Sequence, residues 1–211
     1  MSCFETSKFL KNPEVFSKDI LEKAAQKLNW GYTTTQNEVT ITSIPGKNLY
    51  GEYAMKVKGS RVIYNSYYLK NGKSLIDELK EVFYKLNVEY ARETILTEFK
   101  SKGFTLKKNY EFTPNHEEVD CFYLVGYSKD KNETEKKAVL KFTILKDGTV
   151  VSDSDYIPAD LHELADRAME SIEEKFGHKR REGIEITRKT VPAKYKNKSY
   201  CTVNNKIKAK N

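Results

Sequence analysis

The longest regular pattern in this 211-residue sequence is a helical one that runs from residue 74 to residue 102. Ser74, with Asp77 three residues later, resembles a capping box at the start of a helix. Gly103 suits the left-handed position at which helices commonly end. At 1.5 Å per residue the helix would extend for about 42 Å, enough to back a whole antiparallel sheet, with a possible break near Asn87. Its apolar residues recur at helical spacing: Leu75, Leu79, Val82, Phe83, Leu86, Tyr90 and Phe99.

The segments before and after this helix predict a mixture of strands and shorter helices. Apolar residues at helical spacing predict helices at residues 17–29 and 159–176. Alternating patterns and turn residues predict strands at residues 39–41, 49–57, 61–69, 104–112, 119–127, 138–145, 149–152 and around 184–186. The order is α-βββ-α-ββ followed by ββ-α-β, which predicts an α+β fold of mainly antiparallel sheets backed by helices.

The segment from residue 128 to residue 137 is rich in charged residues and asparagine, which predicts a surface loop. We place a domain boundary in this loop. The expected organisation is an N-terminal α+β domain over residues 1–130 and a small ββαβ domain over residues 136–190. A basic extension over residues 191–211 completes the chain.

The net charge of +7 is concentrated at the C-terminal end. Residues 1–177 contain 26 basic and 28 acidic residues, whereas residues 178–211 contain 11 basic and 2 acidic residues. Cations with interleaved tyrosines suit an acidic partner, either a nucleic acid or an acidic protein surface. A solubilising extension explains the same charge run. The candidate partner-binding residues are Lys179, Arg180, Arg181, Arg188, Lys189, Lys194, Tyr195, Lys196 and Lys198.

Tyrosines also gather on the strands that precede the long helix, beside Arg61 and Lys70. A tyrosine-bearing sheet can stack nucleic acid bases, and Tyr64 and Tyr67 are the candidates for that role. Ordinary cross-strand packing under the long helix is the competing interpretation, and the sequence favours it because tyrosine suits half-buried sheet positions.

Motifs of known chemistry do not support an enzyme, and we expect no catalytic residue, metal or cofactor. His116 lies in a polar loop beside two glutamates, and His162 with Asp166 lies at helical i,i+4 spacing. Solvated positions explain both histidines, and His178 suits a helix C-terminus. Cys121 lies in an apolar strand and is expected to be a buried small hydrophobic residue. An enzyme of unrecognised type stays possible, because catalytic groups converge in space rather than in sequence.

Three isolated cysteines, with no paired spacing, predict reduced thiols in a cytoplasmic compartment. The N-terminal residues lack the apolar stretch of a secretory signal, and no run approaches the 18 apolar residues of a membrane span. We therefore expect a cytoplasmic protein with no membrane partner.

Two short stretches resemble known families of unknown function. The opening Met1-Ser2-Cys3-Phe4, the segment Tyr90-Ala91-Arg92-Glu93-Thr94-Ile95 and Gly103-Phe104 resemble a conserved reading frame of bacteria, phages and algal plastids. The stretches 141–144 and 147–150 are similar to a second short family, often encoded beside the first. Residues 158–160 stand where that second family has Ser-Cys, so no role of its cysteine transfers. The resemblance implies a fusion joined near residues 128–137 and, because such genes accompany AAA-type ATPases, an accessory partner of such an ATPase.

These observations leave three hypotheses of function. The leading one is a non-enzymatic accessory or interaction protein whose basic C-terminal end docks on an acidic partner. The second is a protein that binds RNA or single-stranded DNA with the basic end and the tyrosine-bearing sheet. The third is the unrecognised enzyme.

Overall fold

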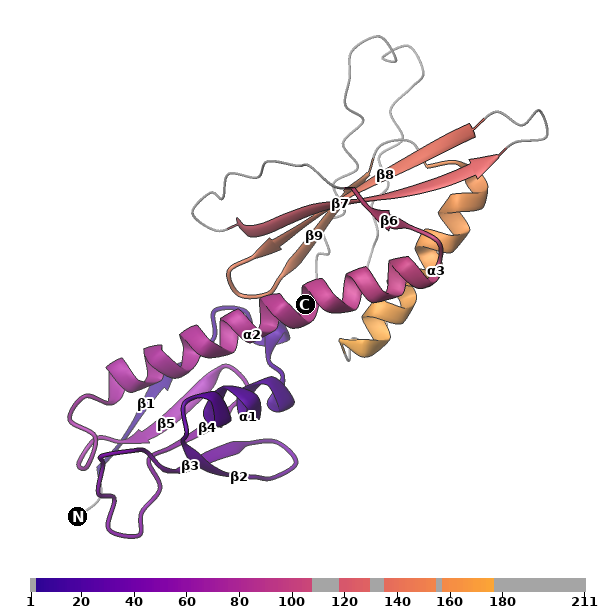
Figure 1. Cartoon of the computed structure of the whole chain (residues 1–211). Coiled ribbons are helices and arrows are strands. Elements are labelled where there is room, and N and C mark those ends of the chain that lie inside the picture. Colours follow the sequence, from indigo (N-terminus) through magenta and orange to yellow (C-terminus); the bar gives the residue numbers. More distant parts are fainter. Residues whose placement is uncertain (1–2, 108–117, 130–134, 155–156, 177–211) are drawn as a thin grey trace. The chain divides into compact units, whose positions relative to one another are not determined.

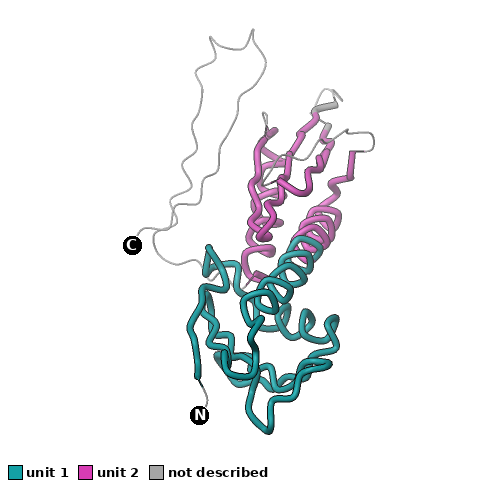
Figure 2. Tube along the Cα trace, turned by 90° about the vertical axis from the view of Figure 1, so that its left-hand side faces the viewer, with its two compact units in different colours: residues 1–89 teal, residues 90–211 magenta. Residues whose placement is uncertain are grey.

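A computed structural model describes residues 3–107, 118–129, 135–154 and 157–176 of the chain. The fold is α+β, as the sequence pattern predicts. The described residues form three α-helices and two antiparallel sheets (Figure 1). The chain divides into two compact units, unit 1 (residues 1–89) and unit 2 (residues 90–211), which Figure 2 shows in different colours.

Unit 1 is built on a five-stranded antiparallel sheet with the strand order β1-β5-β4-β3-β2. A short 3-10 helix, η1 (Pro13–Val15), and α1 (Lys18–Lys27) connect the first two strands in the chain. The helix α2 (Gly72–Ser101) follows the sheet and contributes its residues up to 89 to this unit. The strands are β1 (Phe4–Lys8), β2 (Gly31–Thr34), β3 (Val39–Ser43), β4 (Met55–Lys58) and β5 (Arg61–Asn65).

One face of this sheet packs against α1 and α2. The α1 residues Ile20 and Leu21 and the α2 residues Leu79 and Phe83 are buried in one apolar cluster. Alternate strand residues complete the cluster: Val39, Ile41, Met55, Val57, Val62 and Tyr64. Because successive side chains of a strand point to opposite faces, the residues between them lie on the other face. We call this second face, on which Arg61 and Ile63 are exposed, the open face of unit 1.

Unit 2 is built on a four-stranded antiparallel sheet with the strand order β6-β7-β8-β9. Residues 90–101 of α2 and the helix α3 (Ala159–Lys175) belong to it. Phe99 of α2 packs its ring 5.2 Å from that of Phe104 and 5.1 Å from that of Phe142, which joins the helix to the sheet. The strands are β6 (Thr105–Leu106), β7 (Glu118–Lys129), β8 (Glu135–Leu145) and β9 (Val150–Ser154).

The long helix is confirmed, and it ends as predicted, with Gly103 in the left-handed region at φ +87°. It begins at Gly72, so Ser74 lies within its first turn rather than at the predicted capping position. Its course is continuous at Asn87, whose side-chain amide donates to the carbonyl of Val15 at 3.1 Å, so no break occurs there. The predicted strand 49–57 is shorter in the structure, because Tyr50 and Gly51 adopt positive φ and pairing starts only at Met55.

Other strand predictions were also too long or incomplete. The strand predicted to reach residue 69 ends at Asn65, where the chain turns and the amide of Leu69 bonds to the carbonyl of Asn65. The strands β1 and β2 were not predicted. The strand predicted over residues 104–112 is β6 as far as it is described, and residues 184–186 lie outside the described residues.

The division of the chain differs from the boundary expected near residue 130. Strands β7 and β8 pair as far as Lys129 and Glu135, so the segment expected to separate two domains connects neighbouring strands of one sheet. The boundary between the two units along the chain falls instead between Glu89 and Tyr90, within α2. A charged sequence indicates that a segment is exposed to solvent. Hairpin loops and domain linkers are both exposed, so the composition does not tell one from the other.

Candidate functional site

Three cations stand side by side on the open face of unit 1. Arg61 on β5 lies directly opposite Lys8 on β1 and directly opposite Lys58 on β4. Residues directly opposite each other in an antiparallel sheet share a face, with Cβ atoms about 5 Å apart. All three side chains are exposed. We call Lys8, Arg61 and Lys58 the cationic row.

A tight turn fixes the register of this row. Only Gly59 and Ser60 separate Lys58 from Arg61, and Gly59 has φ +54°. A two-residue hairpin loop makes the residues that flank it a directly opposed pair. The carbonyl of Ser60 also accepts a hydrogen bond from the amide of Phe9 at 2.8 Å, which aligns the end of β1 with the turn.

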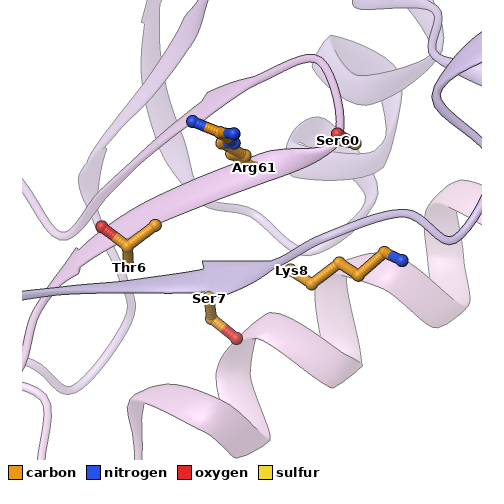
Figure 3. A pocket seen from close by; sticks show the side chains of 5 residues that line it. All are labelled: Thr6, Ser7, Lys8, Ser60 and Arg61. Atoms are coloured by element: carbon orange, nitrogen blue, oxygen red, sulfur yellow. The ribbon is translucent and has the colours of Figure 1, made fainter.

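The cationic row borders a shallow depression lined by Thr6, Ser7, Lys8, Ser60 and Arg61. In Figure 3 the side chains of Thr6 and Arg61 point away from the underlying helix, whereas Ser7 points toward it. No carboxylate of a described residue lies within 4 Å of the three cations. Like charges directly opposite each other destabilise a sheet, so the row is unfavourable to the fold unless an anion neutralises it.

Aromatic rings lie on the same face, toward the other end of β1. Phe4 stacks on Tyr53 with ring centroids 4.9 Å apart and planes at 23°. The ammonium of Lys56 lies 4.5 Å from the centroid of the Tyr53 ring, in cation–π geometry. Ile63, directly opposite both Thr6 and Lys56, is 40% exposed between the aromatic pair and the cationic row.

A second aromatic group lies in the loops at this end of the sheet. Tyr68 contacts Tyr50, with centroids 5.5 Å apart, and Tyr67, with centroids 4.9 Å apart in an edge-on arrangement. Tyr50 is 74% exposed and Tyr67 is 56% exposed. The backbone of Ser66 donates to the carbonyl of Cys3 at 2.8 Å, which places this connection beside the start of β1 (Figure 1). We call Phe4, Tyr50, Tyr53, Tyr67 and Tyr68 the aromatic end.

Tyr64 lies on the covered face and does not suit the stacking role that the sequence suggested. It is 4% exposed, and a Cβ built on Gly72 would lie 2.4 Å from its ring. Its hydroxyl donates to the carboxylate of Glu5, directly opposite on β1. This hydrogen bond lowers the pKa of Glu5 and raises the pKa of Tyr64. Tyr67, the other candidate, is exposed at the aromatic end.

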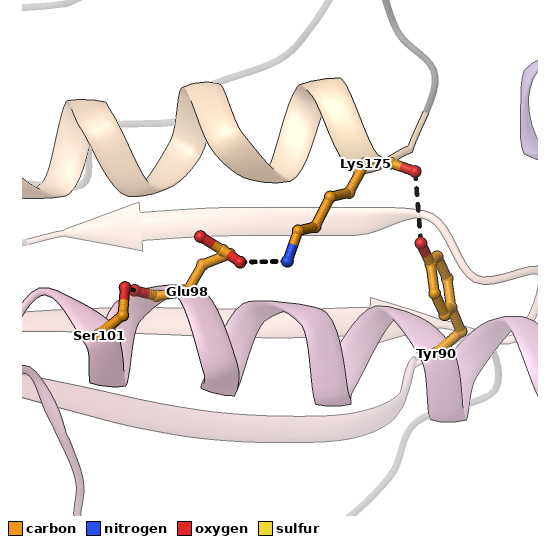
Figure 4. A network of polar contacts seen from close by, with 4 residues as sticks. All are labelled: Tyr90, Glu98, Ser101 and Lys175. Atoms are coloured by element: carbon orange, nitrogen blue, oxygen red, sulfur yellow. Dashed lines mark hydrogen bonds and ion pairs between the residues drawn. The ribbon is translucent and has the colours of Figure 1, made fainter.

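In unit 2, by contrast, charged residues between α2, α3 and the sheet are paired. Lys175 of α3 donates to the carboxylate of Glu98 on α2, and the hydroxyl of Tyr90 donates to the carbonyl of Lys175 at 3.3 Å (Figure 4). The hydrogen bonds from Lys175 and then Ser171 lower the pKa of Glu98, and the Glu98 carboxylate raises the pKa of Lys175. Arg92 of α2 pairs with Asp120 of β7.

The residues considered for catalysis do not converge in the described part of the chain. Nδ1 of His162 lies 2.8 Å from the carboxylate of Asp166, and both line an open depression on α3. Cys121 is half-buried, with its sulfur 3.9 Å from the hydroxyl of Thr143. His116 and His178 lie outside the described residues.

Among the described residues no cluster of three or more histidine, cysteine or acidic side chains could hold a metal. The helices of the described part include none with the length and hydropathy that a bilayer crossing requires. The candidate residues 179–198 of the basic end lie outside the described residues.

The sequence interpretation missed Lys8, Lys58 and Phe4. Lys58 and Arg61 flank the predicted Gly-Ser turn, so their opposition could have been inferred from the hairpin rule. Lys8 and Phe4 had no such signal, because β1 is an edge strand with the polar sequence FETSK. In comparisons with known protein families, curated proteins and solved structures, the chain matches none of them.

Proposed function

We propose that this protein binds nucleic acid on the open face of unit 1. The observation that carries the proposal is the cationic row, three exposed cations in register without a carboxylate of a described residue in ion-pairing distance. Phosphates along a nucleic acid backbone offer a line of anions that fits such a row. The exposed aromatic rings on the same face add surfaces for bases, as in other sheets that bind single strands.

The test measures binding of a fluorescein-labelled RNA and DNA pool of mixed sequence by fluorescence anisotropy, from 50 to 200 mM salt. The variant K8Q/R61Q/K58Q removes the cationic row from the full-length chain. Each phosphate contact contributes about 0.7 to the slope of log affinity against log salt for single strands, so the slope should fall by about 2. The matched control K27Q/K80Q/K85Q removes three cations that pair with Glu89, Asp77 and Glu81.

The control variant has the same net charge as the test variant, so it should bind like the parent protein. Equal losses in both variants would mean that net charge alone attracts the probe, and no loss in the row variant would refute the proposal. Absence of any binding at 50 mM salt would refute it as well.

An accessory protein that docks its basic end on an acidic protein, including an AAA-type ATPase, is the second candidate function. The residues after Gly177, which include 11 basic and only 2 acidic residues, favour it. The variant K179Q/R180Q/R181Q separates the two candidates, because it leaves the cationic row intact. Loss of capture of a partner protein in this variant, with nucleic acid binding retained, would support docking through the basic end.

A further inference from the structure

The stacked pair Phe4–Tyr53 and the cationic row lie on one face at a fixed spacing, and the loop tyrosines of the aromatic end adjoin the Phe4 end of β1. Phe4 and Lys8 are four residues apart on β1, which corresponds to about 14 Å along a strand at 3.4 Å per residue. One nucleic acid strand carries a phosphate about every 3.4 Å along a stacked helix. A helically stacked strand therefore reaches from the stacked pair Phe4–Tyr53 to the row with about four nucleotides, and a more extended strand with fewer.

The exposed rings distinguish between single and double strands. The bases of a duplex are stacked on one another, so a duplex offers a protein surface its phosphates and groove edges rather than the flat faces of its bases. An unpaired base exposes both flat faces, and every base has such a face, so its stacking on a tyrosine or phenylalanine does not require a particular sequence. Phe4, Tyr50 and Tyr67 each keep 40% or more of their surface exposed.

Tyr50 supplies an independent observation. Its backbone has φ +51°, a region that residues with a Cβ adopt at a cost, and its side chain is the most exposed of the large hydrophobic residues in the described part. Its amide donates to the side-chain carbonyl of Asn48 at 3.1 Å, which holds the turn. The fold thus keeps an exposed tyrosine in a left-handed conformation beside Tyr68, where glycine would fit without strain.

We propose that the ligand is a single-stranded nucleic acid, with unpaired bases stacked on the aromatic end and the adjoining phosphates on the cationic row. This inference rests on the proposed function and adds the class of ligand and the role of the rings. The strand runs along β1 and β5, with Ile63 beneath it between the two sites. An acidic protein offers carboxylates for the row but no flat rings at this repeat.

The variant Y50G/Y67A tests the stacking role in the full-length chain. Glycine adopts the left-handed backbone of residue 50, and residue 67 lies in an exposed turn, so the fold should persist. The matched control is Y127A, which removes a tyrosine that is 54% exposed in unit 2. The probes are a labelled single strand of 12 nucleotides of mixed sequence, the 12-base-pair duplex of the same sequence, and single strands of two to eight nucleotides.

We expect the single strand to bind more tightly than the duplex. In Y50G/Y67A its affinity should fall roughly 5- to 150-fold for each base that loses its stacking partner, while the duplex affinity and the Y127A variant stay unchanged. Affinity should rise with length until the strand spans the distance of about 14 Å between the two sites, which takes at most about four nucleotides.

Other outcomes overturn this inference while leaving the proposed function in place. Tighter binding of the duplex would do so, as would equal losses for both probes or no loss for either. If poly-L-glutamate displaces the labelled strand as well as an unlabelled single strand of equal charge does, the site binds any polyanion and the rings do not select nucleic acid. If neither the single strand nor the duplex binds at low salt, the proposed function itself fails, and the two failures are thereby distinguished.

Discussion

The open face of unit 1 and the helix–sheet region of unit 2 differ in how their cations are balanced. In unit 2, Arg92 pairs with Asp120, and its guanidinium lies 4.9 Å from the ring centroid of Phe122. Lys175 pairs with Glu98, which is 9% exposed. On the open face of unit 1 the cationic row crosses three strands without a carboxylate of any described residue within 4 Å.

This difference separates the cations that have a partner within the fold from those that have none among the described residues. A paired cation beside a buried carboxylate stabilises the packing of a helix, because removal of either partner leaves the other without their shared hydrogen bond. Three cations in register repel one another and stabilise nothing within the sheet. The ligand that we propose outside the fold would account for their presence, and the proposal is therefore placed on unit 1 rather than on unit 2.

The largest expected effect comes from removing a paired cation. The substitution Lys175→Met leaves the Glu98 carboxylate with Ser171 but without its ammonium partner, and should lower the thermal midpoint by a few degrees. Thermal unfolding followed by circular dichroism measures this shift. The control is Lys100→Met, because Lys100 is exposed on α2. Equal midpoints for the two variants would show that the Lys175–Glu98 pair does not hold α3.

The same pair makes unit 2 sensitive to acid. Because hydrogen bonds from Lys175 and Ser171 lower the pKa of folded Glu98, its contribution to stability is complete above the ordinary glutamate pKa, about 4.3. That contribution is lost as the pH falls through the lower pKa of the folded state. Glu98→Gln cannot titrate, so it should be less stable than the parent at pH 7 but lose less stability on acidification.

Urea unfolding at pH 7, 5, 4 and 3 measures this difference. Glu5, whose pKa is lowered by Tyr64, contributes equally in both proteins and cancels in the comparison. If the free energy of unfolding falls equally with pH in the parent and in Glu98→Gln, Glu98 is not the source of the acid sensitivity.

Local sequence signals predicted the elements well where period and end signals agreed. Gly103 ends α2 as expected, and Ser17 caps α1 by accepting from the amide of Ile20. The hairpin signal at Gly59 and Ser60 was also correct. Each of these features depends on interactions between residues a few positions apart, so a short stretch of sequence is enough to predict it.

The candidate site was less predictable because it depends on strand neighbours. Tyr64 and Tyr67 are three residues apart, yet Tyr64 faces the helices and Tyr67 lies in an exposed turn. Tyr67 lies beyond the end of β5 at Asn65, whereas Tyr64 lies within the sheet. The position of Tyr64 is fixed by β5 pairing with β1, where Glu5 lies opposite it, 59 residues away, and β1 has no apolar alternation that would predict a strand. Opposition of Lys8 and Arg61 is a property of that pairing.

The smallest expected effect has an unusual sign. Lys58→Gln removes a like charge directly opposite Arg61 and should stabilise the protein by about 0.2–1 kcal/mol at low salt. Urea unfolding at 10 mM and 1 M salt measures this gain, which should vanish at 1 M salt, where the Debye length is about 3 Å. The control Lys85→Gln breaks an i,i+4 pair with Glu81 at 2.9 Å and should destabilise by about 0.3–0.5 kcal/mol.

A stability change of opposite sign for Lys58→Gln and Lys85→Gln would confirm that a positive charge destabilises the sheet face and stabilises the helix surface. A gain that persists at 1 M salt would attribute the effect to packing rather than charge. If Lys58→Gln destabilises the protein at low salt, the row already has a counter-charge within the chain. An external anion would then no longer be needed to explain why three cations stand in register, and the case for a nucleic acid ligand would rest on the exposed rings alone.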